Sequence, residues 1–115
     1  MAGSRNDVQY EQWQIHSRSK TASYSVAGQD SRDCFNNLGA TGSVTFTLPK
    51  AKGNGVEYYF LVATSQFLIV APQSTDLIRG KAAGLSYSSS TQGNVIYVCT
   101  IVPGIWDIFY NNGFA

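Results

Sequence analysis

Charged side chains are scarce in this chain of 115 residues: Asp, Glu, Lys and Arg make up only 13% of it, against about 25% in an average globular domain. The formal net charge is +1, and basic residues gather only in close pairs, such as Arg18 with Lys20 and Lys50 with Lys52. A nucleic-acid-binding protein needs a broad basic surface to neutralise phosphates. We therefore expect no nucleic-acid partner, and the near balance of charge leaves little repulsion between copies of the chain.

Residues that build catalytic or metal sites are also few. His16 is the single histidine, so a Ser–His–Asp triad or a zinc site would depend on that one position. Asp30 and Asp33 flank a turn, where their side chains can bond their own backbone, while Asp76 and Asp107 are isolated. We therefore predict a protein that is not an enzyme and that uses no metal or cofactor.

Cysteines are few, and long apolar runs are absent. Cys34 and Cys99 are the only cysteines, far from a disulfide framework, although one bridge between them stays open because pairing depends on distance in the fold. No apolar run approaches the ~20 residues of a membrane span, and the N-terminus is too polar for a signal peptide. We expect a protein without a membrane association that assembles in a reducing cytoplasm.

What the chain does contain is short apolar runs between turns, with 43% hydrophobic residues. In residues 43–48, Val44, Phe46 and Leu48 alternate with hydroxyl residues, as in a half-buried strand. The apolar runs at 56–63 and 67–72 predict two central strands joined as a hairpin. No helical stripe is present. The pattern predicts an all-β fold, a compact antiparallel β-sandwich or barrel of about eight short strands in a single domain over residues 22–115.

The first 21 residues differ from the rest of the chain. They are polar but carry an apolar comb that fits neither the helical nor the strand period, at Val8, Tyr10, Trp13 and Ile15. A frayed terminus is one interpretation. Because a frayed tail has little use for Trp13 and Ile15, we favour an extended N-terminal arm over residues 1–21 that is ordered by docking on a neighbouring subunit.

Aromatic residues make up 13% of the chain. Tyr58 and Tyr59 are adjacent in a predicted strand, so their rings must point to opposite faces. Trp106, Phe109 and Tyr110 likewise cannot all share one face. The candidates for rings exposed at a protein interface or stacked on a sugar are Tyr58, Tyr59, Trp106 and Tyr110.

Most of the chain beyond residue 22 carries a recurring set of turns and strands. The runs SYSVAGQDSRDCFNNLGATGSVTFTLPKA, VEYYFLVATSQFLIVAP and DLIRG are followed by the strands NVIYVCTI and GIWDIFY. This series resembles a β-module of tailed-bacteriophage virion structural proteins, found in capsid decoration, head-fibre and tail-fibre-type proteins. The residues of its turn and strand motif are Asn37, Gly39, Gly42, Thr45, Thr47 and Pro49.

The resemblance implies a non-enzymatic virion component, a homotrimer that decorates the capsid exterior after assembly in the host bacterial cytoplasm. Its partner would be the major capsid protein lattice, which it would cement through an attachment arm comprising Val8, Tyr10, Trp13, Ile15 and Arg18. Two alternatives stay open. The chain could be a tail-fibre or tail-tip module that recognises host-surface glycan through its aromatics, or a neck or tail adaptor. Scarce charge fits all three, because neutral polar faces are less costly to bury between subunits than ion-rich ones.

Overall fold

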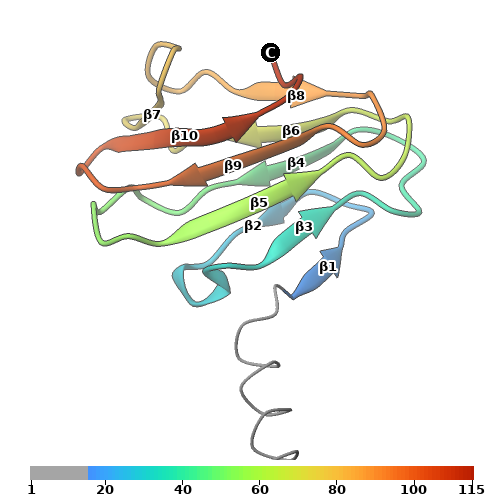
Figure 1. Ribbon diagram of the computed structural model, residues 1–115, viewed down its shortest axis with the longest axis horizontal. Coiled ribbons are helices and arrows are strands. Elements are labelled where there is room, and N and C mark those ends of the chain that lie inside the picture. The colour runs from blue at the N-terminus through green and yellow to red at the C-terminus, as the bar shows by residue number, and fades with distance from the viewer. Residues whose placement is uncertain (1–15) are drawn as a thin grey trace, which may run out of the picture.

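The computed structural model describes residues 16–115 (Figure 1). Four of the predicted arm residues, Val8, Tyr10, Trp13 and Ile15, lie outside this range. The described chain forms ten short strands and one 3₁₀ turn, η1 (Gly28–Asp30). The strands are β1 (Ser17–Ser19), β2 (Tyr24–Ser25), β3 (Cys34–Asn36), β4 (Val44–Thr47), β5 (Glu57–Leu61), β6 (Leu68–Ala71), β7 (Leu77–Ile78), β8 (Tyr87–Ser89), β9 (Val95–Cys99) and β10 (Ile105–Asn111).

These strands make two sheets, so the all-β class is confirmed. One sheet has six strands in the order β1-β3-β5-β9-β10-β7, and the other has four in the order β2-β4-β6-β8. From β1 to β6 the chain alternates between the sheets, and each strand pairs in parallel with the strand two places earlier. The first six strands therefore form three solenoid-like coils, β1 with β2, β3 with β4, and β5 with β6.

The winding corrects the predicted antiparallel sandwich or barrel of about eight strands. Among the strands of residues 16–115, antiparallel pairing is confined to the pairs made by β8, β9 and β10, which close the stack. The predicted hairpin between residues 56–63 and 67–72 is also wrong, because β5 and β6 lie in different sheets. The reason is physical: a half-buried strand alternates apolar and polar residues whether its neighbour is parallel or antiparallel, and a short polar break between strands serves a coil corner as well as a hairpin.

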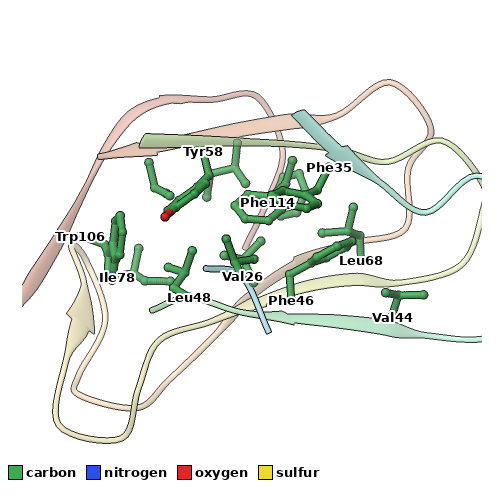
Figure 2. Close-up of a cluster of buried hydrophobic side chains, with 14 of the residues drawn as sticks. Val26, Phe35, Val44, Phe46, Leu48, Tyr58, Leu68, Ile78, Trp106 and Phe114 are labelled. Atoms are coloured by element: carbon green, nitrogen blue, oxygen red, sulfur yellow. The ribbon is translucent and has the colours of Figure 1, made fainter. Parts of the chain in front are cut away.

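The core lies between the two sheets (Figure 2). The predicted alternation in β4 is confirmed, since Val44 and Phe46 are buried and the threonines between and beside them are half-buried. Phe46 meets Phe35 and Phe60 of the other sheet, with ring centroids 5.3 and 5.4 Å apart. These rings hold the layers together across the middle of the molecule.

Asn37 fastens one coil corner to the next. Its side chain is fully buried in the turn after β3. The carbonyl oxygen accepts hydrogen bonds from the backbone N–H groups of Ala63 (2.8 Å) and Thr64 (3.1 Å), and the amide nitrogen donates to the carbonyl of Gln66 (3.0 Å). The corner between β3 and β4 is thus bonded to the corner between β5 and β6, which explains why this motif position holds an amide.

A charged clasp fastens β1, the edge strand of the first coil. Arg18 Nη1 donates to Asp30 at 2.7 Å and to Asp33 at 3.1 Å, and the Tyr24 hydroxyl donates to Asp30 at 3.0 Å. Burial acts to raise the pKa of Asp30, but the hydrogen bonds from the Ala27 N–H, Tyr24 and Arg18 together hold it below its usual value. Residues 17–19 of the predicted arm therefore belong to the sheet of the domain, and Arg18 uses its guanidinium within the fold.

Candidate functional site

A group of aromatic side chains lies on the outer face of the six-stranded sheet, turned away from the core. Tyr59 alternates with buried Tyr58 and Phe60 along β5, and Tyr97 lies between buried Ile96 and Val98 along β9. Tyr59 pairs with Tyr97 in the register of the sheet, and Tyr97 pairs with Tyr110 of β10. We call Tyr59, Tyr97, Phe109 and Tyr110 the outer aromatic row.

A bulge in β10 sets the exposed end of the row. Ile108 pairs with Val98 and Tyr110 with Tyr97, so Phe109 is an extra residue in the strand. In an ordinary strand Phe109 and Tyr110 would point to opposite faces. The extra residue breaks the alternation, and both are exposed, by 50% and 53%. About half of the surface of each of these two residues thus meets solvent at this end of the row.

The charges beside the row are neutralised within the chain. Glu57 and Asp107 flank it on β5 and β10, and both pair with Cys99 of β9 in the register of the sheet. Arg79 Nε lies 2.8 Å from Asp107, and Arg32 Nε lies 4.0 Å from Glu57. Burial, followed by the neighbouring Tyr59 and Glu57, raises the pKa of Tyr97. The row is therefore an uncharged surface with phenol hydroxyls over a rigid sheet.

The orientation of the rings limits what the row can bind. Tyr59 and Tyr97 stack on each other, with centroids 4.2 Å apart and planes 17° from parallel, and Phe109 meets Tyr97 edge-on at 5.4 Å. A sugar is bound by stacking on a free aromatic face, whereas two of these faces are already occupied by each other. Protein side chains pack equally well against ring edges. The geometry favours a protein segment over a saccharide as the occupant of Tyr59 and Tyr97.

Two of the four predicted exposed aromatics are not exposed, which corrects the sequence-based interpretation. Tyr58 and Trp106 are fully buried, and the Tyr58 hydroxyl donates to the carbonyl of Ala27 at 2.9 Å. Burial, then Asp30 and Asp33, raises the pKa of Tyr58 to about 12. Each residue lies on the core face of its strand.

The other two predicted aromatics, Tyr59 and Tyr110, belong to the row, together with two residues that sequence reasoning missed. Tyr97 carried little signal, because it lies in the continuous apolar run VIYVC, and its outward position is seen only in the burial pattern of β9. Phe109 carried none, because its exposure follows from a bulge that the sequence does not mark.

The motif residues of the resemblance lie away from the row and serve the coils. Gly39 has a φ of +84°, a left-handed conformation that favours glycine, whereas a Cβ at Gly42 would meet nothing within 4 Å. Thr45 and Thr47 are half-buried on the outer face of β4, in the four-stranded sheet. Pro49 follows that strand and is one of the residues that line a groove. The motif therefore describes how the chain winds.

A groove beside Pro49 is a concave feature of the described part of the chain. It holds about 200 Å³ and is lined by Gly28, Pro49, Lys50, Lys52, Asn54 and Val56. Small-molecule sites usually hold about 300–1,000 Å³ with convergent polar groups. The groove is smaller, and its Lys50 already lies 4.0 Å from buried Asp76. We therefore place the candidate site at the outer aromatic row.

Histidine, cysteine and carboxylate side chains do not gather into a metal site within residues 16–115. No group of three or more His, Cys, Asp or Glu side chains is placed there to hold a metal ion. His16 lies 3.8 Å from Asp33 and is otherwise exposed. Cys34 and Cys99 are both free, and burial raises the pKa of each thiol. In the same part of the chain, no helix has the length and apolar character needed to cross a membrane.

No protein-family model matches the chain, and no curated protein matches its sequence.

Proposed function

We propose that this chain is a non-enzymatic structural protein of a tailed-bacteriophage virion, and that it decorates and cements the capsid. The proposal joins the resemblance of residues 23–78 to one structural observation, the outer aromatic row. The row exposes large rings on an uncharged sheet face whose flanking carboxylates are already paired. Such a surface suits burial against protein, because covering it leaves no unpaired charge.

The mechanism we propose is stabilisation by preferential binding. A protein whose contacts are spread over several coat subunits binds the assembled lattice and not its separate parts, so it shifts the equilibrium towards the lattice. In a homotrimer, three N-terminal segments on one body would strengthen attachment without any new type of contact. The short turns and the corner bonds of Asn37 keep the body rigid while the segments reach neighbouring subunits.

The decisive experiment is particle binding by a truncated chain. Because β1 and Arg18 are part of the domain, the truncation should remove residues 1–15 and not 1–21. We expect the truncated protein to keep the melting temperature and oligomeric state of the full chain but to lose co-sedimentation with heads of the phage that encodes it. Undiminished occupancy of heads would refute attachment through this segment.

The matched surface control uses one exposed Phe within the row and one outside it. Phe109 and Phe67 are both 50% exposed, but Phe67 lies immediately before β6, outside the row. We expect Phe109→Ser to weaken head binding and Phe67→Ser to leave it unchanged. Copy number per virion then separates head from tail: hundreds of copies fit a decoration protein, while a handful would indicate a tail part or an adaptor.

A second candidate is recognition of host-surface glycan by a tail module. The observation that favours it is Tyr110, which is 53% exposed and makes no ring contact with another described aromatic residue, so its face is open to a sugar. A glycan array probed with the full chain tests this. Binding that Tyr110→Ser abolishes would favour the tail module, and silence across the array would favour decoration.

A further inference from the structure

The outer aromatic row continues laterally to the point where residues 1–15 join the domain. In the register of the sheet, Tyr110 pairs with Tyr97, Tyr97 with Tyr59, Tyr59 with Cys34, and Cys34 with Ser17. These five residues therefore form one line across five strands. The N-terminal segment enters the sheet immediately beside the start of that line, at His16, whose carbonyl accepts a hydrogen bond from the Cys34 N–H at 2.7 Å.

The dimensions of the segment match those of the line. Four steps between neighbouring strands, from Ser17 to Tyr110, measure about 19 Å at about 4.8 Å each. Residues 8–15 span about 23 Å when extended, at about 3.3 Å per residue. An extended segment leading into His16 is thus long enough to cross the whole row without a gap.

The chemistry of the segment also matches the row. Its sequence from residue 8 to residue 15 is VQYEQWQI, with Val8, Tyr10, Trp13 and Ile15 as apolar members and Glu11 as the single charge. The row offers aromatic edges and hydroxyls, and Glu57 and Asp107 beside it already have cationic partners. Apolar and aromatic side chains on both sides can therefore be buried together without leaving a charge unpaired.

We infer that residues 8–15 of the free protein pack across the outer aromatic row of their own domain. This inference goes beyond the proposed function, because it concerns the chain before it meets any particle. Residues 8–15 are favoured over a second copy as the occupant, because their covalent connection to the domain holds them near the row at millimolar effective concentration. A second copy docked face to face is a poorer occupant. The row and the strand lengths define a patch of only about 300 Å², against about 800 Å² per partner in a standard interface.

Tryptophan fluorescence tests the inference directly. The chain has two tryptophans, Trp13 in the segment and Trp106, and Trp106 is fully buried and so shielded from a solution quencher. Acrylamide quenching of the full chain, corrected with a Trp13→Phe chain that reports Trp106 alone, measures the exposure of Trp13. We expect Trp13 to be protected in the full chain at low micromolar concentration.

The surface variants give the size of the effect. A docked state that is preferred tenfold, equivalent to about 1.4 kcal/mol, shields Trp13 in about nine molecules of ten. Replacing the exposed rings with Phe109→Ser and Tyr110→Ser should therefore raise the quenching constant of Trp13 by up to about tenfold. Phe67→Ser, which replaces an equally exposed Phe immediately before β6, should leave it unchanged. Thermal melting checks that each variant is folded, and Tyr110→Ser alone replaces the double variant if that one melts early.

Three results would overturn the inference. Trp13 could be as accessible in the full chain as in a free peptide of residues 1–15. It could stay protected when the row is replaced. Its protection could increase with protein concentration together with the sedimentation coefficient, which would show that the segment occupies a neighbour's row. None of these measurements uses phage particles, so failure here leaves the decoration proposal standing, and failure to bind heads leaves this inference standing.

Discussion

Asn37→Ala is the substitution whose cost can be worked out most directly from the fold. The buried amide makes three hydrogen bonds to the backbone of the next corner, with the N–H groups of Ala63 and Thr64 and the carbonyl of Gln66. A hydrogen bond contributes about 1 kcal/mol net, and more when its loss strands a buried partner. We therefore expect the free energy of unfolding to fall by about 3 kcal/mol.

Such a loss is large against the roughly 5–15 kcal/mol of a typical domain. Chemical denaturation followed by circular dichroism measures it as a lower midpoint with an unchanged slope. In a domain of this size the melting temperature should fall by more than about 10 °C. Asn54→Ala is the control, because Asn54 is exposed in the loop before β5, and a surface substitution there should change stability by less than about 0.5 kcal/mol.

Asn37→Asp separates hydrogen bonding from packing at the same site. An ionised carboxylate cannot donate to the Gln66 carbonyl, and burial raises the pKa of the introduced group above its unfolded value. The penalty of this variant relative to the native chain should therefore be greatest at neutral pH and should shrink as the pH falls through the raised folded pKa. A cost for Asn37→Ala below about 1 kcal/mol, or a penalty for Asn37→Asp that is independent of pH, would refute the corner-bond reasoning.

Three further predictions concern the clasp, a loop glycine and the core. Hydrogen bonds lower the folded pKa of Asp30, so its contribution to the free energy of unfolding is present above the unfolded pKa of about 4 and is lost as the pH falls through the lower folded pKa. When stability is measured against pH in the acid range, this part of the pH dependence should be missing in Asp30→Asn. Arg18→Ala should cost about 2 kcal/mol at pH 7. Gly53→Ala should destabilise the fold by about 2 kcal/mol or more, because Gly53 has a φ of +71° and a Cβ there would lie 2.7 Å from the ring carbon Cδ of Pro103. Gly42→Ala is the control and should leave the melting temperature unchanged. Trp106 Nε1 is the one buried side-chain nitrogen or oxygen of the described chain without a hydrogen-bond partner. Trp106→Phe therefore loses no hydrogen bond and should lower the free energy of unfolding by only about 1 kcal/mol, whereas the larger cavity of Trp106→Ala should lower it by about 4 kcal/mol. Denaturant titrations measure both values.

The sequence was sufficient to predict the central strands and the buried face of β4, but not which strands pair. Alternation of Val44, Phe46 and Leu48 located β4 and its core face, because the pleat imposes a period of two on any half-buried strand. The same period holds in parallel and antiparallel ladders, so the coil winding could not be distinguished from a hairpin. That distinction depends on long-range pairing, such as that of Thr45 with Ile69, which no local pattern records.

The candidate site was predictable in part for a similar reason. Tyr58 and Tyr59 could be assigned to opposite faces, because they are adjacent in a strand. Which of the two rings is buried depends on which side the second sheet covers. The run VIYVC does not mark the outward face of Tyr97, and the shared exposure of Phe109 and Tyr110 depends on a bulge whose position is set by the pairing of β10 with β9.

The three-coil winding also has a consequence for how the protein is made. Each new coil packs on the coil that was synthesised immediately before it, since β3 pairs with β1, β5 with β3, and β6 with β4. The stack can therefore grow in the order in which the chain leaves the ribosome, without waiting for a distant strand. The later strands reach back across the chain, β9 to β5 and β10 to β7, and the arrival of β9 covers the open edge of β5. A nascent chain that stalls before β9 would expose that edge, and pairing between two such chains is the aggregation route that this topology leaves open.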